Sequence, residues 1–380
     1  GLVDFGVFAI DKPAFYFGGI TRAALMPDQS PPLDLPSRVS YIAKSGKPDL
    51  WVHPLAAATT GLSGEKLAEI GLMRAAGARG ISTGRTWIAD SATMLRVLQY
   101  AAMLDLVVVT HAEDAALVGG AAATAGEMAT RLGLPSAPAQ AEAIAVARDI
   151  ALADMAGARL HFRQVTTAAA LDLVRAAKAR GLPVTAGVTP AHFMLSDLAT
   201  GEFRTFARLS PPLRCEDDRQ AVREAIADGT IDVIASGHDP RGVEDKRLPF
   251  ADAEAGMAGA ETLLALSLTL VRDGIIDMPR LAALLAGAPA KLLGVDAGEL
   301  ESLRGSADVV RSADGSINSA RVEAEYRNIL RQIEQIELQI SDNTAMEQRS
   351  TEGGVVRQRV SESAADYYRR LSEQPQQLAR

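Results

Sequence analysis

The chain has 380 residues and a formal net charge of −8, and 48% of its residues are apolar while only 4% are aromatic. An anionic protein is a poor general binder of nucleic acid or of anionic membranes, because both need a cationic surface. No apolar run reaches the roughly 20 residues that a membrane span needs, and we expect no leader peptide. The single cysteine, Cys215, cannot form an intrachain disulfide, which suits a reducing, cytoplasmic location.

Short apolar runs alternate with amphipathic helical stretches along most of the chain, which is typical of repeated βα units. Because aromatic residues are few, the core must consist mainly of Ala, Leu, Val and Ile, as in helices packed on buried parallel strands. Strands are predicted at Val3–Ile10, Ile20–Met26, Leu50–Leu55, Gly80–Ser82, Leu106–Thr110, Ala158–Phe162, Pro183–Val188 and Asp232–Ala235. Helices are predicted between them, among others at Gly64–Ala76, Ser91–Met103, Ala139–Ala156, Ala168–Arg180 and Glu216–Ala227.

Eight strands with crossover helices favour an α/β fold of the (β/α)₈ TIM-barrel type, in which the chemistry lies at the carboxyl ends of the strands. An open, doubly wound sheet is the alternative, and the strand count does not exclude it. Only a few residues separate the first strand from the turn at Gly18–Thr21, whereas a parallel crossover normally needs a dozen or more. We therefore expect the first crossover helix to be missing.

The character of the chain changes after residue 310. An apolar seam with spacings of four and three residues predicts a coiled-coil-like helix, formed by Val322, Tyr326, Ile329, Ile333, Ile336 and Ile340. Two polar strand-like runs around Thr351–Gly354 predict a hairpin, and a helix with Tyr367 and Tyr368 follows. We expect a barrel domain at 1–310 and a helix–hairpin–helix appendage at 311–380. The appendage is weakly similar in layout to phage head–tail joining modules, and oligomerisation is its simpler interpretation.

Several short sequence motifs follow one another along the first 310 residues. They are Gly18–Thr21 with Ala24–Asp28, Leu209–Arg214, Gly229–His238, Pro249–Phe250, Gly259–Thr262 and Pro289–Gly294. Each motif is weak alone, but their order and spacing resemble the dihydroorotases of the amidohydrolase superfamily. The resemblance implies a TIM-type barrel that holds one or two divalent metals and hydrolyses or closes a cyclic amide.

Metal-assisted hydrolysis needs imidazole and carboxylate ligands to hold the ion and a further group to carry protons. At four positions where the resemblance implies metal ligands, the side chains cannot grip a divalent cation: Gly6, Phe8, Thr83 and Gln164. Ile10 stands where the resemblance implies an arginine for the carboxylate of the substrate.

Other positions keep part of the pattern. Gly237 stands at the position of the catalytic aspartate, and His111 is the one remnant of the ligand set. A single histidine does not hold zinc, because affinity depends on several converging donors. Three residues are candidates for lining a substrate pocket: Asp28, which replaces a substrate-binding asparagine, His192 and His238.

These losses favour a catalytically impaired dihydroorotase homologue, a pseudoenzyme without a cofactor that acts as a structural or assembly subunit in pyrimidine biosynthesis. The resemblance implies an association with aspartate carbamoyltransferase, and the apolar seam favours an oligomer, with no nucleic-acid or membrane partner. Two alternatives stay open. One is an active cyclic amide hydrolase with zinc and an atypical site around His111, Asp28 and His238. The other is a composite chain whose tail sets a structural, oligomerising role.

Overall fold

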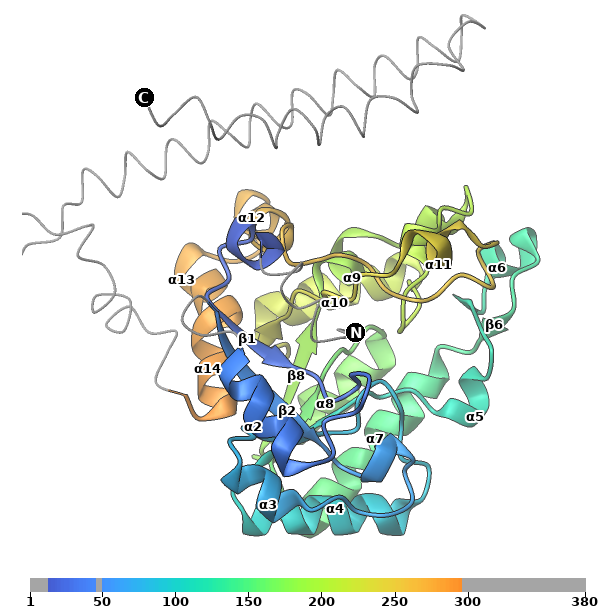
Figure 1. Cartoon of the computed structure of the whole chain (residues 1–380). Coiled ribbons are helices and arrows are strands. Elements are labelled where there is room, and N and C mark those ends of the chain that lie inside the picture. The colour runs from blue at the N-terminus through green and yellow to red at the C-terminus, as the bar shows by residue number, and fades with distance from the viewer. Residues whose placement is uncertain (1–12, 46–49, 296–380) are drawn as a thin grey trace, which may run out of the picture. The chain divides into compact units, whose positions relative to one another are not determined.

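The computed structural model of the chain describes residues 13–45 and 50–295. Within them, seven parallel strands form one curled sheet, a half-barrel, in the order β1-β2-β3-β4-β7-β8-β9 (Figure 1). Their bounds are β1 Arg22–Leu25, β2 Trp51–Ala57, β3 Gly80–Ser82, β4 Val107–Thr110, β7 Leu160–Phe162, β8 Val184–Val188 and β9 Val233–Ile234.

The order of the strands decides between the two predicted architectures. Spatial order follows chain order from β1 to β9, without the reversal that creates the crevice of a doubly wound sheet. The barrel-type prediction is therefore confirmed for the described strands, and the doubly wound alternative is wrong. The predicted first strand, Val3–Ile10, lies outside the described residues.

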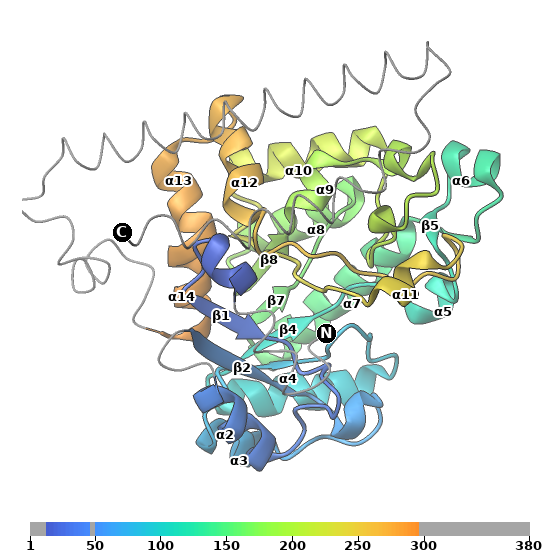
Figure 2. The ribbon, with the colours of Figure 1, turned by 45° about the horizontal axis from the view of Figure 1, so that its top comes forward.

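Helices cover the outer face of the sheet, and consecutive ones lie side by side (Figure 2). The covering helices are α2 Pro36–Ser45, α3 Ile70–Ala75, α4 Ser91–Met103, α7 Gln140–Ala156, α8 Ala168–Ala179 and α10 Glu216–Asp228. Between β4 and β7 the chain also forms α5 (Ala115–Val118), α6 (Glu127–Leu132) and a small sheet of β5 (Ala123–Thr124) and β6 (Ser136–Ala137). After β9 come α11 Val243–Arg247, α12 Leu263–Arg272, α13 Met278–Ala282 and α14 Ala288–Leu293.

Most predicted helices are confirmed to within a residue or two, but the prediction for Gly64–Ala76 begins too early. The helix starts only at Ile70, because the backbone before it forms hydrogen bonds with a neighbouring segment. Thr59 and Leu67 form an antiparallel bridge, and the Ala68 amide donates to the Ala58 carbonyl. Those donors and acceptors are not free for an earlier helical turn.

The described part of the first connection, before β1, is helical over residues 13–17. The start of this helix lies outside the described residues, so the prediction that the first crossover helix is missing stays open. The predicted boundary at residue 310 and the predicted helix–hairpin–helix appendage lie outside the described residues. Both predictions therefore stay open, as does the predicted first strand. None of the helices within the described ranges has the length and apolarity to cross a membrane.

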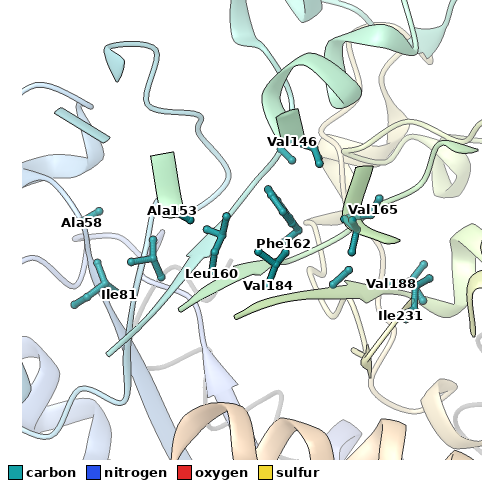
Figure 3. Packing of buried hydrophobic residues seen from close by; sticks show 14 of the residues in the cluster. Ala58, Ile81, Val146, Ala153, Leu160, Phe162, Val165, Val184, Val188 and Ile231 are labelled. Atoms are coloured by element: carbon teal, nitrogen blue, oxygen red, sulfur yellow. The ribbon is translucent and has the colours of Figure 1, made fainter. Parts of the chain in front are cut away.

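Two apolar layers hold the barrel together, one on each face of the sheet. Leu160 and Phe162 point outward and pack under the covering helices, for example against Val146 (Figure 3). On the other face Leu55, Val107 and Val109 form an inner cluster with part of α14. Because side chains alternate along a strand, His161 lies on the inner face between Leu160 and Phe162. The same alternation carries Arg163, directly after β7, toward the barrel mouth.

Candidate active site

The candidate site gathers at the carboxyl ends of the strands. His111 follows β4 directly, and its amide donates to the Thr83 hydroxyl beyond β3 over 3.3 Å. On the other side the Arg163 amide donates to the Thr110 carbonyl over 2.9 Å, so β7 places Arg163 beside His111. The barrel topology therefore brings together residues that are far apart in the sequence.

His111 is buried and coupled to a carboxylate. Its Nε2 lies 3.1 Å from Oε2 of Glu113, and Oε1 of Glu113 accepts a hydrogen bond of 3.1 Å from Arg214. Burial alone raises the pKa of Glu113, but the hydrogen bonds and charges of His111 and Arg214 outweigh burial and lower it. An ionised carboxylate only accepts, so Nε2 of His111 carries the proton. In the neutral ring, Nδ1 then has the lone pair, and it has no hydrogen-bond partner among the described residues.

Arg214 connects this couple to a second buried carboxylate. Its Nη2 lies 3.3 Å from Oε2 of Glu142, a fully buried residue, and its Nε donates to Thr166 over 2.9 Å. Glu142 also accepts hydrogen bonds from the backbone amides of Thr166 and Thr167, both of 2.8 Å. Both carboxylates share the cation of Arg214, and their remaining oxygen contacts are hydrogen-bonded, so the cluster fixes the position of Glu113 and, through it, the ring of His111.

A second ionic cluster joins three loops at the barrel mouth. Arg85, beyond β3, donates to Asp28 beyond β1 over 2.7 Å and also to Asp239 beyond β9. Asp239 accepts a further hydrogen bond of 2.9 Å from Arg241. The negative charge of Asp28, which replaces a neutral asparagine of the resemblance, is therefore balanced by Arg85. The other oxygen of Asp28, Oδ1, is buried and has no hydrogen-bond partner in the described part of the chain.

The two remaining pocket candidates have structural contacts. His192 is buried, with Nε2 3.0 Å from the Pro211 carbonyl and Nδ1 2.8 Å from the Thr189 hydroxyl. Both ring nitrogens are therefore engaged: Nδ1 within its own segment, and Nε2 with the loop around Pro211. The Nδ1 atom of His238 accepts from the Ala260 amide over 3.1 Å, and its ring packs edge-on against Phe15.

The described residues do not fit the metal centre that the resemblance implies. Within 13–45 and 50–295, no three His, Cys, Asp or Glu side chains come close enough together to hold an ion. Thr83 accepts from the His111 amide, and Gln164 accepts from Arg163 over 3.0 Å. Gly6 and Phe8 lie outside the described residues.

Gly237, just beyond β9, has a backbone conformation that favours glycine. Its φ is +58°, and a Cβ atom there would lie 2.7 Å from Cγ2 of Thr189. Such a distance is shorter than real Cβ contacts, so a side chain at position 237 requires a shift of Thr189.

Residues 3–170 match the protein family described as dihydro-orotase-like. A dihydroorotase of Desulfotalea psychrophila is 44% identical over 284 residues, which are 74% of this chain and 68% of the relative. A dihydroorotase of a Geobacter species is 39% identical, with 82% and 74% covered. A dihydroorotase-like protein of Pseudomonas putida is 38% identical, with 82% and 76% covered.

The chain belongs to the dihydroorotase-like family. Solved structures agree on the fold of this dihydroorotase-like chain. The L-hydantoinase of Arthrobacter aurescens superposes with a TM-score of 0.68 at 24% identity, covering 77% of this chain and 68% of the hydantoinase. The dihydroorotase of Saccharomyces cerevisiae gives 0.61 at 15% identity, covering 75% and 80%. At these identities the structures support the barrel fold alone.

The prediction of a catalytically impaired assembly subunit is wrong. Relatives at 38–44% identity that match 67–74% of their own length carry the name dihydroorotase, which favours an active cyclic amide hydrolase. The expectation that the chain is not an enzyme loses its support with it. The error came from inferring a loss of activity from the loss of ligand side chains alone, which the relationship to proteins named dihydroorotase does not support.

The sequence analysis named His111 and Asp28 as site candidates but did not name the arginines that the structure places around them. Arg85, Arg163 and Arg214 each lie one to four residues beyond a described strand or in a loop that crosses the mouth. The sequence does contain a signal for such residues. A basic residue directly after a buried strand is a site candidate, because the carboxyl ends of the strands meet at the active site of a barrel.

Proposed function

We propose that this chain is a cyclic amide hydrolase of the dihydroorotase type, which opens or closes the ring of dihydroorotate at the carboxyl ends of the barrel strands. The relationship to proteins named dihydroorotase carries this proposal. The hydrogen-bonded pair of His111 and Glu113, just beyond the carboxyl end of β4, supports the same function. Ring opening needs a group that exchanges protons with water and substrate, and a histidine can do so.

His111 is the group best arranged for this exchange. With Nε2 protonated toward Glu113, the free Nδ1 lone pair takes a proton from the attacking water as its oxygen bonds to the ring carbonyl carbon. As the carbon–nitrogen bond breaks, the same proton passes to the ring nitrogen, which leaves as part of the open-chain product. The carboxylate behind the imidazole fixes its tautomer and stabilises its protonated form.

No step is assigned to a metal, because the described residues do not fit one. Zinc is nevertheless the cofactor that the family resemblance implies, so the test includes it. The experiment follows the interconversion of dihydroorotate and N-carbamoyl-aspartate by the purified full chain in three forms: as isolated, after dialysis against a chelator, and after addition of zinc.

Turnover in the chelated form supports the function with the histidine as the proton carrier. Turnover that needs zinc also supports the function, and it would show that ligands outside the described residues complete a metal site. A chain that converts neither compound in any of the three forms would overturn the proposal. Arg247→Gln, an exposed change on α11, serves as the preparation control.

A further inference from the structure

Arg163 lies at the barrel mouth with part of its guanidinium group open to a further acceptor. Its Nη2 donates to Oε1 of Gln164 over 3.0 Å and lies 3.4 Å from the Ser210 carbonyl. Its Nε is buried without a hydrogen-bond partner, and within residues 13–45 and 50–295 Arg163 forms no ion pair. A buried N–H without an acceptor loses the hydrogen bond that water would give it. A bound group that accepts from this N–H would remove that cost.

The backbone and the charge of Arg163 place it at the centre of the candidate site. Its amide donates to the Thr110 carbonyl, directly before His111. The carboxylates whose charge acts on Arg163 belong to both ionic clusters of the mouth: Asp28, Asp239 and Glu113. Each of them is paired with another arginine, Arg85 or Arg214. Burial lowers the pKa of Arg163 and these carboxylates oppose that effect, and a guanidinium group stays protonated at neutral pH.

This cation is held by a residue at a ligand position of the resemblance. Gln164 stands where the resemblance implies a metal histidine, and its side-chain oxygen accepts from Arg163. Thr83, at a second such position, accepts from the His111 amide. Within the described ranges no three His, Cys, Asp or Glu side chains converge to hold an ion. In this part of the chain, a position that the resemblance gives to a metal ligand therefore binds a guanidinium group.

Opening of a cyclic amide needs a positive charge at one place. When the oxygen of water bonds to the ring carbonyl carbon, negative charge develops on the carbonyl oxygen. A metal ion meets this need by polarising the carbonyl. A guanidinium group brings a fixed positive charge and several N–H donors, so it can stabilise the same oxygen without a metal.

We propose that Arg163 is a catalytic residue that donates to the carbonyl oxygen of the scissile amide and stabilises its negative charge in place of a metal ion. This rests on the proposed function for the reaction. As the water oxygen bonds to the carbon, the electron pair of the carbon–oxygen double bond moves to the oxygen beside Arg163, and His111 takes the proton of the water. The pair then re-forms the double bond as the carbon–nitrogen bond breaks, and the ring nitrogen receives the proton from His111.

Equilibrium binding tests Arg163 without turnover. Barbiturate is a pyrimidine ring that carries a negative charge on its ring oxygens and has no carboxylate, and uracil is a similar neutral ring. Calorimetry compares the two on the full chain and on Arg163→Gln. We expect the dissociation constant for barbiturate to rise about 10- to 100-fold in the variant, the range for a hydrogen bond to a charged group. The value for uracil should rise less than about fivefold, since a neutral carbonyl accepts a weaker hydrogen bond.

Steady-state kinetics of the full chain, after dialysis against a chelator, tests the role of Arg163 in the reaction. For Arg163→Gln we expect kcat for dihydroorotate to fall about 100- to 1000-fold, the loss expected for one donor to a developing oxyanion. KM should change by less than about threefold, because the interaction forms mainly in the transition state. A group that only binds the carboxylate of the substrate would instead raise KM and leave kcat unchanged.

Two further variants make the comparison specific. Arg163→Lys keeps the charge but loses the planar arrangement of donors, so it should recover part of kcat and of the barbiturate affinity. Arg247→Gln on α11 removes an exposed guanidinium group and should change neither. Circular dichroism melting shows whether each variant is folded, and Arg163→Lys and Arg163→Met carry the test if Arg163→Gln is not.

The outcomes separate the role of Arg163 from the proposed function. A wild-type chain that binds barbiturate no more tightly than uracil overturns that role, as does a folded Arg163→Gln that keeps the wild-type kcat. Turnover of the wild type that needs zinc leaves the function standing and overturns the replacement of the ion by Arg163. A wild-type chain that selects barbiturate through Arg163 but never converts dihydroorotate supports the anion site and overturns the proposed function.

Discussion

Nε of Arg85 donates a hydrogen bond of 2.7 Å to Oδ2 of Asp28, a residue 57 positions earlier in the chain. This pair joins the loops beyond β1 and β3 and balances a negative charge at the barrel mouth. It also leaves Oδ1 of Asp28 buried without a partner among the described residues, close enough for its charge to act on Arg163.

Asp28→Asn should therefore strengthen the binding of an anionic substrate. The change removes a negative charge at the barrel mouth, while Arg85 stays paired with Asp239. We expect KM for dihydroorotate to fall about 3- to 10-fold, the effect of one partly screened charge at this range. Steady-state kinetics at two salt concentrations measures it, and the gain should shrink at high salt. A KM that rises would show that Asp28 contacts the substrate favourably.

Arg214→Met should be strongly destabilising. The substitution keeps much of the buried volume but leaves Glu113 and Glu142 without their shared cation. Breaking a buried ionic cluster in this way costs about 3–5 kcal/mol of unfolding free energy. Urea denaturation measures the loss, with the exposed Arg247→Met as the control that should change stability by less than about 0.5 kcal/mol. A loss below about 1 kcal/mol would contradict the account of this cluster.

Stability should fall as the pH is lowered, because two histidines are buried in their neutral form. Burial lowers the pKa of His161 from 6.5 to about 3 and that of His192 from 6.5 to about 4. Between these values and 6.5 the unfolded chain binds protons that the folded chain does not, so unfolding becomes easier as the pH falls. Each histidine contributes a slope of about 1.4 kcal/mol per pH unit.

His161→Gln isolates one of these contributions. Glutamine does not titrate and still offers a polar group to Thr185, which lies 2.9 Å from Nδ1 of His161. The free energy of unfolding, measured from pH 7 to pH 4.5, should fall less steeply in the variant than in the wild type. Parallel curves would mean that His161 does not stay neutral in the folded chain.

Gly237→Ala should destabilise the barrel mouth by about 1–3 kcal/mol, because its Cβ atom meets Cγ2 of Thr189 and its φ is positive. Thr189→Ser removes that methyl group, so the double variant should recover the steric part of the loss. Thermal melting of both single variants and the double variant measures the coupling. Independent, additive effects would contradict the close contact.

The sequence predicted the strands well for a simple reason. Runs such as Val107–Thr110 are buried on both faces, so their apolar character does not depend on which partner they meet. The helix predicted from Gly64 failed at its start because a tertiary bridge between Thr59 and Leu67 overrides local preference. The predicted aspartate carbamoyltransferase partner and the oligomer stay predictions.

The site was predictable only in part. Asp28 and His111 follow strands directly, so their place at the mouth could be read from the order of the elements. The role of Glu113 could not, because its partner Arg214 lies 101 residues later and only the folded barrel brings the two together. Among the described residues Arg163 forms no ion pair, and this too depends on where the neighbouring carboxylates Asp28, Asp239 and Glu113 find their own cations.

Whether His111 is the catalytic centre is decided by kcat/KM for dihydroorotate, measured for His111→Asn, for the wild type and for the control Arg247→Gln. His111 lies at the proposed centre and Arg247 on an exposed helix, so the account predicts a loss of at least about 100-fold in the first variant and none in the second. Unchanged kcat/KM in a folded His111→Asn protein would contradict it, because the catalytic centre would then lie elsewhere.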